Sequence, residues 1–285
     1  MKYAILGDLH GCVINLKRIQ KKLKQCDVIF ITGDITGTIS YPLVIKSILK
    51  TRKISREKYT ELVYTKYLEK FTKFQINTAK KIFKILGRLN KPVFFTHGNS
   101  DTDKARDFLE EVSNDNPNLF YVGNRIKIFE KLEVIGYGFC SPAKYRTSLQ
   151  TPGEKEEVDI KSDLKMLEQL FHSIPTSDDK IIIGLFHEPP KDTKLDYIPK
   201  KATHGGSNLI REHISKIPYS YSFAGHIHES QNQDKIGSII AINPGALVDR
   251  KYTILNLEDN DISFERLFLP LSLKELIYRT RDVFK

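Results

Sequence analysis

The chain has 285 residues, enough for a sizeable apolar core and for one or two domains. Hydrophobic residues make up 40% and charged residues 28%, and no apolar run reaches the roughly 18–20 residues that span a bilayer. These values indicate a globular protein and exclude a transmembrane helix. The net charge of +10 suits an anionic partner, but lysines scattered at helical spacing are typical of solvated faces, so charge alone does not identify that partner.

Cysteine usage and the N-terminus indicate the compartment. The three cysteines, Cys12, Cys26 and Cys140, have no Cys-x-x-Cys spacing, so neither a disulfide framework nor a structural zinc knuckle is predicted. The first apolar stretch ends at Asp8, as in a buried strand and unlike a signal peptide. We therefore expect a cytoplasmic protein without membrane attachment.

The chain begins with a predicted strand–helix–strand unit. Lys2–Leu6 is an apolar strand, Cys12–Lys24 carries apolar residues at helical spacing, and Val28–Thr32 is a second, β-branched strand. Such units normally place both strands side by side and parallel. The charged, amphipathic stretch Ser55–Leu89 then predicts one or two helices, an insert expected to cap the site or to mediate dimerisation.

The rest of the chain alternates predicted strands, helices and loops. Leu119–Phe129 and Leu132–Tyr137 are expected to pair as strands. Further strands are predicted at Pro92–Thr96, Lys180–Phe186, Tyr219–Ala224, Lys235–Ile242, Tyr252–Leu257 and Ile262–Phe268. Helices are predicted at Thr102–Val112, Val158–Phe171, Ser207–Lys216 and from Ser272, and loops at Ser141–Gly153 and Glu188–Gly206. Without a repeat or a linker, a single domain over residues 1–285 is predicted, with the helical insert at about 55–89.

Polar side chains recur just beyond the carboxyl ends of predicted strands, where ligands bind in open α/β sheets. They are Asp8, His10, Asp34, Asn99, His187, His226 and His228. Carboxylate oxygens and imidazole nitrogens are ligands for manganese, iron or zinc, and thiolates are absent from this set. A single carboxylate such as Asp34 can bridge two cations about 3.5–4 Å apart, the spacing of hydrolytic two-metal sites.

These residues fall into ordered motifs that carry a family resemblance. In chain order they are Asp8-Leu9-His10-Gly11, Gly33-Asp34-Ile35-Thr36-Gly37, Gly98-Asn99-Ser100-Asp101, the isolated His187, and Gly225-His226-Ile227-His228. The set resembles the calcineurin-like metallophosphoesterase superfamily over most of the chain. The resemblance implies an α/β (α+β) fold, a four-layer αββα sandwich of two mixed β-sheets flanked by helices, with the metal site at the C-terminal edge of the strands.

The resemblance also implies a role for each residue. Asp8, His10 and His228 would hold a first cation, Asn99, His187 and His226 a second, and Asp34 would bridge both. A hydroxide held between the cations would attack phosphorus in line, while Asn99 would stabilise the charge on the phosphoryl oxygens. The expected cofactors are two divalent ions, with manganese first and iron, zinc, nickel or cobalt as alternatives.

One position departs from the family pattern. Ser100 stands where many members have a histidine that can protonate the leaving group, and a hydroxyl is too weak an acid for that role. Either the substrate has a good leaving group, or another residue supplies the proton. His204, in a glycine-rich loop before a predicted helix, is the candidate; a plain loop histidine with Ser207 as helix cap is the alternative. Asp101 is expected to cap the helix beginning at Thr102.

We therefore expect a hydrolase of small phosphate esters. A phosphodiesterase is favoured, because the family members with a small residue at the position of Ser100 include phosphodiesterases. A nuclease acting on DNA or RNA is the alternative, although no clustered arginines and aromatic platform indicate nucleic acid. A non-catalytic binding scaffold is a third reading, against which the complete ligand set argues. The sequence leaves the oligomeric state open, with a dimer allowed.

Overall fold

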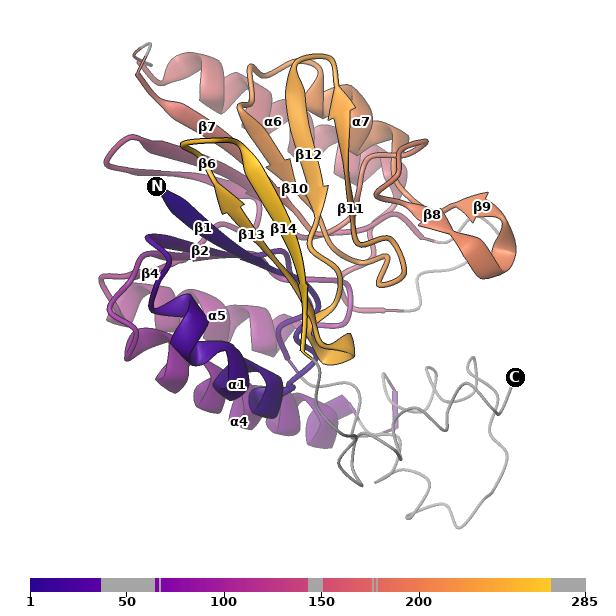
Figure 1. Ribbon diagram of the computed structural model, residues 1–285. Helices are drawn as coiled ribbons and strands as arrows, with labels where there is room; N and C mark the ends of the chain where they lie inside the picture. The colour runs from indigo at the N-terminus through magenta and orange to yellow at the C-terminus, as the bar shows by residue number, and fades with distance from the viewer. Residues whose placement is uncertain (37–64, 67, 143–150, 176, 178, 268–285) are drawn as a thin grey trace.

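Two six-stranded mixed β-sheets lie face to face at the centre of the structure (Figure 1). The computed structural model describes residues 1–36, 65–66, 68–142, 151–175, 177 and 179–267. The first sheet has the order β14-β13-β1-β2-β3-β4. Its strands are β1 Lys2–Leu6, β2 Val28–Ile31, β3 Val93–Phe95, β4 Leu119–Tyr121, β13 Lys251–Asn256 and β14 Asp261–Arg266. Strands β1 to β4 run parallel, β13 pairs antiparallel with β1, and β14 pairs antiparallel with β13.

The second sheet has the order β11-β12-β10-β7-β6-β5. Its strands are β5 Arg125–Phe129, β6 Leu132–Tyr137, β7 Ile181–Phe186, β10 Tyr221–Phe223, β11 Asn232–Ile236 and β12 Ile239–Asn243. The four inner strands run parallel, whereas β5 and β11 are antiparallel edges. A small separate hairpin is formed by β8 Tyr197–Ile198 and β9 Thr203–His204. Parallel strands bring their carboxyl ends to one edge, which sets the position of the site.

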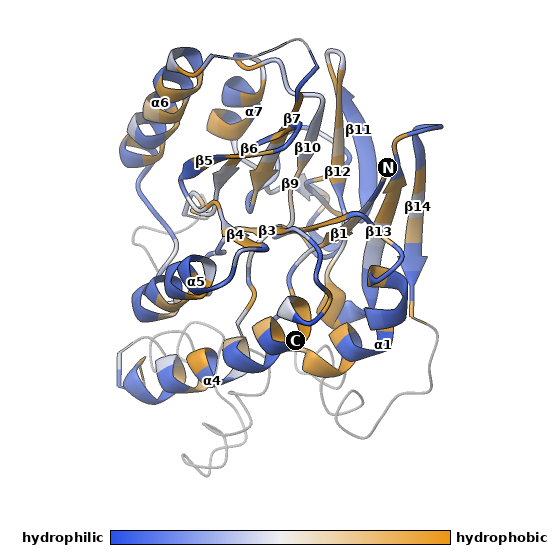
Figure 2. Ribbon diagram, turned by 90° about the vertical axis from the view of Figure 1, so that its left-hand side faces the viewer, coloured by the Kyte–Doolittle hydropathy of each residue, from blue (hydrophilic) through white to orange (hydrophobic). Residues whose placement is uncertain are grey.

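Helices cover the outer faces of both sheets (Figure 2). The first sheet is covered by α1 Val13–Leu23, α4 Leu68–Gly87 and α5 Asp103–Asp115, and the second by α6 Glu157–Ser173 and α7 Asn208–Ile214. Short 3₁₀ turns, η1 Pro199–Lys201 and η2 Leu247–Asp249, lie in the connections. The predicted four-layer αββα sandwich is confirmed.

Three apolar clusters hold these layers together, and the central one is aromatic. Phe30 of β2 lies between the sheets with its ring centroid 5.1 Å from that of Tyr3 and 5.1 Å from that of Phe223 in the opposite sheet. Burying aromatic side chains of this size dominates core energetics. The sheets are therefore fixed relative to one another close to the ends of β2 and β10, from which site residues emerge.

Two predicted strands each divide in two. Leu119–Phe129, predicted as one strand, splits into β4 in the first sheet and β5 in the second. The chain turns between the layers at Gly123 and Asn124, and Asn124 has a φ of 57°. The predicted pairing with Leu132–Tyr137 holds for β5 alone. Lys235–Ile242 divides into β11 and β12 at Gly237, whose φ of 61° suits a residue without a side chain.

The predicted insert lies partly outside the described residues, as does the helix predicted from Ser272. The described part of the insert contains α4, whose Ala79, Ile82 and Leu86 pack into the apolar cluster on the outer face of the first sheet. This helix is therefore a layer of the sandwich. In the part of the chain that the structure describes, none of the helices has the length and apolar character needed to cross a membrane. The assignment of the whole chain to one domain stays a prediction.

Candidate metal centre

All seven predicted ligands lie at the carboxyl ends of parallel strands. Asp8 and His10 follow β1, Asp34 follows β2, Asn99 follows β3, His187 follows β7, and His226 and His228 follow β10. Four of them adopt the left-handed backbone region, with φ of 45° at Asp8, 42° at His10, 46° at Asp34 and 66° at His226. Each such residue costs about 1–3 kcal/mol and persists where the surrounding structure requires it, as at functional sites.

The first group of side chains gathers around Asp8, His10 and His228, whose ligand atoms lie within 4.8 Å of one another. His228 Nε2 is 3.2 Å from His10 Nε2 and 3.4 Å from Asp8 Oδ1. Three donors from two strand ends thus face one small volume. This is the set that the family resemblance implies for the first cation.

The second group gathers around the amide of Asn99. Its Oδ1 lies 3.1 Å from His187 Nε2 and 3.1 Å from His226 Nδ1. Asp34 joins the two groups, because its Oδ2 is 3.5 Å from His10 Nε2 while its Oδ1 is 3.7 Å from His187 Nε2. One carboxylate therefore presents an oxygen to each group, as a bridging ligand does.

Hydrogen bonds outside the groups fix the ligand rings. His187 Nδ1 donates to the carbonyl of Thr32 at 2.8 Å, and this bond holds the ring with Nε2 facing the Oδ1 of Asn99. His228 Nδ1 lies 3.4 Å from Asp249 Oδ2. Outer partners of this kind orient metal-binding imidazoles and raise their basicity.

Charges within the site shift several pKa values. Burial lowers the pKa of His10 and, with the neighbouring His187, lowers that of His226 to about 4, so both rings are in the neutral form, which is the form that binds a cation. Burial opposes a charge on His228, yet Asp8 and Asp249 raise its pKa to about 10. Burial would also raise the pKa of Asp8, but His228 and the other imidazoles lower it below its usual range.

Asp101 does not cap α5, as the sequence had suggested; Thr102 occupies the N-cap and makes no side-chain cap bond. Asp101 is fully buried and accepts hydrogen bonds from Gly98 N at 2.9 Å and from Thr36 N at 3.0 Å. It thereby ties the loop of Asp34 to the loop of Asn99. Helix α4 supports the same loop, because Gln75 Nε2 donates to the Ser100 carbonyl at 2.7 Å.

His204 lies apart from the two groups, on β9. Its Nδ1 is 2.8 Å from the Oδ1 of buried Asp196 and its ring contacts Tyr197. Among the described residues, no hydrogen bond or ion pair joins His204 to any of the seven ligands. The hairpin nevertheless abuts the His226–His228 loop, since Ser230 Oγ donates to the Tyr197 carbonyl and a Cβ at Gly205 would lie 3.2 Å from Ile227. The N-cap role of Ser207 is confirmed, because its side chain accepts from Ile210 N.

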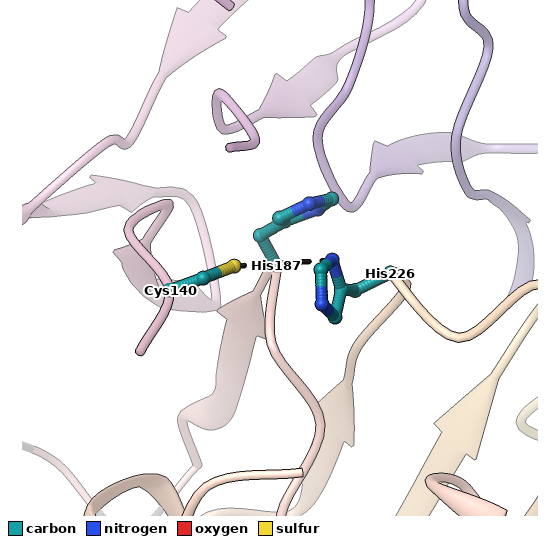
Figure 3. A group of neighbouring side chains, drawn as sticks. All are labelled: Cys140, His187 and His226. Atoms are coloured by element: carbon teal, nitrogen blue, oxygen red, sulfur yellow. Dashed lines mark hydrogen bonds between the residues drawn. The ribbon is translucent and has the colours of Figure 1, made fainter. Parts of the chain in front are cut away.

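Cys140 is a site residue that sequence reasoning missed. Its Sγ is 4.0 Å from His226 Nδ1, and with His187 and His226 it forms a third group of closely spaced ligand atoms (Figure 3). The available signal was its position shortly after β6, at the same edge as the other ligands. A lone cysteine without a motif did not draw attention to it.

The donor set fits divalent cations. The oxygen and imidazole nitrogen atoms of these groups, buried at Asp8, Asp34 and His187, are ligand types that suit manganese, iron or zinc.

Several known proteins are similar to this chain in sequence or in fold. Protein MJ1162 of Methanocaldococcus jannaschii is 29% identical over 170 residues, which are 57% of this chain and 69% of that protein. The crystal structure of TT1561 from Thermus thermophilus is similar with a TM-score of 0.60 at 15% identity, covering 93% of this chain and 98% of that one. A dimetal phosphatase from Danio rerio has a TM-score of 0.50 at 10% identity, covering 93% and 95%. At these identities the solved structures show a shared fold. The family model for metallophosphoesterases of the calcineurin superfamily matches residues 2–267, and the chain belongs to that family.

Proposed function

We propose that this protein is a phosphodiesterase that hydrolyses small phosphate diesters with two divalent cations, manganese first among them. The observation that carries the proposal is the carboxylate of Asp34, with Oδ2 turned to His10 and Oδ1 turned to His187. Cations held there would polarise the phosphoryl oxygens and lower the pKa of water toward neutrality. The protein's own part is to hold and orient the ligands in a largely buried site.

Asn99 is oriented for the second position. Its Nδ2 donates to Thr151 Oγ1 at 3.1 Å, which turns Oδ1 toward His187 and His226. The amide therefore has one fixed orientation, with its oxygen available as a ligand. We assign Asn99 to the second position and to the stabilisation of charge on the phosphoryl oxygens.

We expect a preference for diesters with good leaving groups, because Ser100 is a poor acid for protonating the departing oxygen. Ser100 Oγ donates to Asp34 Oδ2 at 2.9 Å, so its proton is engaged with a carboxylate and its hydroxyl is a poor acid. We assign His204 as the proton donor for substrates with poor leaving groups. Buried Asp196 holds its Nδ1, so Nε2 is the ring nitrogen that would serve the leaving group. Diesters with good leaving groups need no such donor.

The test begins with metal-free protein reconstituted with manganese, iron, zinc, nickel or cobalt. Each form is assayed on aryl diesters, cyclic nucleotides, aryl monoesters, nucleotides and DNA. We expect manganese-dependent hydrolysis of diesters. Asp34→Asn should lower kcat/KM about a thousandfold, because metal stabilisation of the transition state is worth several kcal/mol.

Asp27→Asn is the matched control, because Asp27 precedes β2 at its amino end, whereas Asp34 follows the same strand at its carboxyl end. It should keep the wild-type rate. Full activity of the metal-free protein, or of Asp34→Asn, would refute the proposal. Hydrolysis of DNA in preference to small diesters would establish the nuclease instead.

A further inference from the structure

Cys140 places a sulfur atom beside the second group of ligands. Its Sγ lies 4.0 Å from His226 Nδ1, and the ligand atoms of Cys140, His187 and His226 all fall within 4.8 Å of one another. Figure 3 shows the sulfur of Cys140 pointing to the ring of His226, with His187 next to both. The three side chains come from three separate strand ends, after β6, β7 and β10.

The other buried cysteine has a different environment. Cys26 packs in the apolar cluster beneath the first sheet, and its thiol donates to the carbonyl of Lys22. Cys140 is 1% exposed, yet it belongs to none of the three apolar clusters of the described residues. Its sulfur contacts the imidazole of His226, a predicted ligand.

The backbone around Cys140 is held in place from the same site. Cys140 N donates to the Gly153 carbonyl and Lys155 N donates to the Cys140 carbonyl, both at 3.0 Å. Gly153 N in turn donates to the Asn99 carbonyl at 3.0 Å, and a Cβ at Gly153 would lie 2.6 Å from Gly98 O, so only glycine allows this approach. Cys140 and Asn99 are therefore connected through one residue.

We propose that Cys140 Sγ is a ligand of the cation held by Asn99, His187 and His226, and that it makes this position select ions with a higher affinity for thiolate, such as zinc, cobalt or cadmium, over manganese. The proposal rests on the metal-dependent function proposed above. As the sulfur–metal bond forms, the Sγ–H bond breaks and its proton passes to water. The first position, with Asp8, His10 and His228, has no sulfur and would remain suited to manganese.

The observed spacing allows this ligation with little movement. Metal–sulfur and metal–nitrogen bonds of about 2.3 and 2.1 Å, at an angle between roughly 110° and 130°, place the two donor atoms about 3.6–4.0 Å apart. The distance of 4.0 Å between Cys140 Sγ and His226 Nδ1 lies at the upper end of that range. Binding of a cation would need only a small adjustment of the side chains.

Cobalt provides a direct test, because a thiolate bound to Co²⁺ gives a near-ultraviolet charge-transfer band that oxygen and nitrogen ligands do not give. Metal-free wild type and Cys140→Ser are titrated with Co²⁺. A Cys12→Ser/Cys26→Ser double variant, whose one remaining thiol is Cys140, serves as the control. We expect the band in wild type and in the double variant and its loss in Cys140→Ser. The affinity of Cys140→Ser for Cd²⁺ should fall about tenfold or more, since even the loss of an outer partner of a ligand costs about 10–100-fold in metal affinity. The affinity of the first position for Mn²⁺ should stay unchanged.

The outcomes separate the two proposals. If the double variant binds two Co²⁺ without the band, Cys140 is not a ligand and the metal-dependent function stands. If wild type binds no divalent ion, both proposals fail. The double variant keeps the test decisive even if Cys140→Ser does not fold, because its spectrum reports on Cys140 directly.

Discussion

Ser100 holds both oxygens of the Asp34 carboxylate. Its backbone N–H donates to Oδ1 at 2.8 Å and its hydroxyl donates to Oδ2 at 2.9 Å, and both residues are buried. The residue that departs from the family pattern is thus engaged with the carboxylate that joins the two groups of ligands. A serine here contributes orientation where a histidine could contribute a proton.

Ser100→Ala should weaken metal binding while preserving the fold. The backbone N–H to Oδ1 remains, but Oδ2 loses its donor, and losing an outer partner of a ligand typically costs about 10–100-fold in metal affinity. Calorimetric titration of Mn²⁺ into the metal-free variant measures this. Ser113→Ala is the control, because Ser113 Oγ also makes two hydrogen bonds, with Leu119 O and Tyr121 N, away from the ligands. Wild-type affinity in Ser100→Ala would show that the serine does not orient the carboxylate.

His204→Ala should affect substrates according to their leaving groups. A general acid contributes about 10²–10⁴-fold, so kcat for an alkyl diester should fall by at least about a hundredfold, while kcat for a p-nitrophenyl diester stays unchanged. His172→Ala, at an exposed position of α6, is the control. Equal effects of His204→Ala on both substrates, or no effect on the alkyl diester, would remove His204 from the reaction.

The ligand positions were predictable because their signal is local. Asp8, Asp34 and Asn99 lie two to four residues after the end of a short apolar strand, each next to a glycine, and parallel strands end at the same edge of a sheet. Strand and helix positions were predictable for the same reason, since apolar periodicity is read within a few residues. The four layers came from the family resemblance, not from the pattern alone.

Other features depend on contacts between distant segments. Gly123 and Asn124 mark a turn within Leu119–Phe129, but the assignment of its two halves to different sheets depends on the distant strands that they meet. The bonds of Asp101 to the Asp34 loop and the approach of Cys140 to His226 join positions 65 and 86 residues apart. The local sequence predicts that Asp101 caps the helix, but its carboxylate instead accepts hydrogen bonds from Thr36 and Gly98.

Glu188 should make the stability of the metal-free protein depend on pH. Burial raises its pKa from 4.5 to about 8, with Glu157 and Glu154 adding to the effect, although Ser141 donates two hydrogen bonds to Oε2. Because the folded protein binds this proton more tightly than the unfolded chain, the stabilisation is complete below pH 4.5 and is lost as pH rises through 8. The free energy of unfolding should fall by at most about 1.4 kcal/mol per pH unit from this one group.

Urea unfolding with a chelator, at intervals between pH 5 and 8.5, measures this slope. Glu188→Gln should reduce the loss of stability with rising pH, because the amide is neutral throughout and still offers Ser141 an acceptor. Glu212→Gln, at an exposed position of α7, should leave the slope as in wild type. Parallel curves for wild type and Glu188→Gln would show that Glu188 does not carry the extra proton.

Asn243 should support the histidine loop from the end of β12. Its Nδ2 donates to Leu195 O at 2.9 Å and to Ile227 O at 3.0 Å, and its Oδ1 accepts from Gly245 N at 2.8 Å. Asn243→Ala leaves three buried backbone groups without this hydrogen-bond partner. Each buried group left unsatisfied costs about 1–3 kcal/mol, so the free energy of unfolding should fall by about 3 kcal/mol or more. Since Ile227 lies between His226 and His228, Mn²⁺ affinity should fall about tenfold as well.

Unfolding and calorimetric titration of the same preparation separate these two effects. Asn118→Ala is the matched control, because Asn118 Nδ2 likewise donates to a backbone carbonyl, that of Lys91, but at the amino ends of β3 and β4. It should lose some stability and no metal affinity. Asn243→Asp should resemble Asn243→Ala, because a carboxylate cannot donate to Leu195 O and Ile227 O even though its shape is the same. Wild-type metal affinity in both Asn243 variants, despite lower stability, would restrict Asn243 to a role in folding.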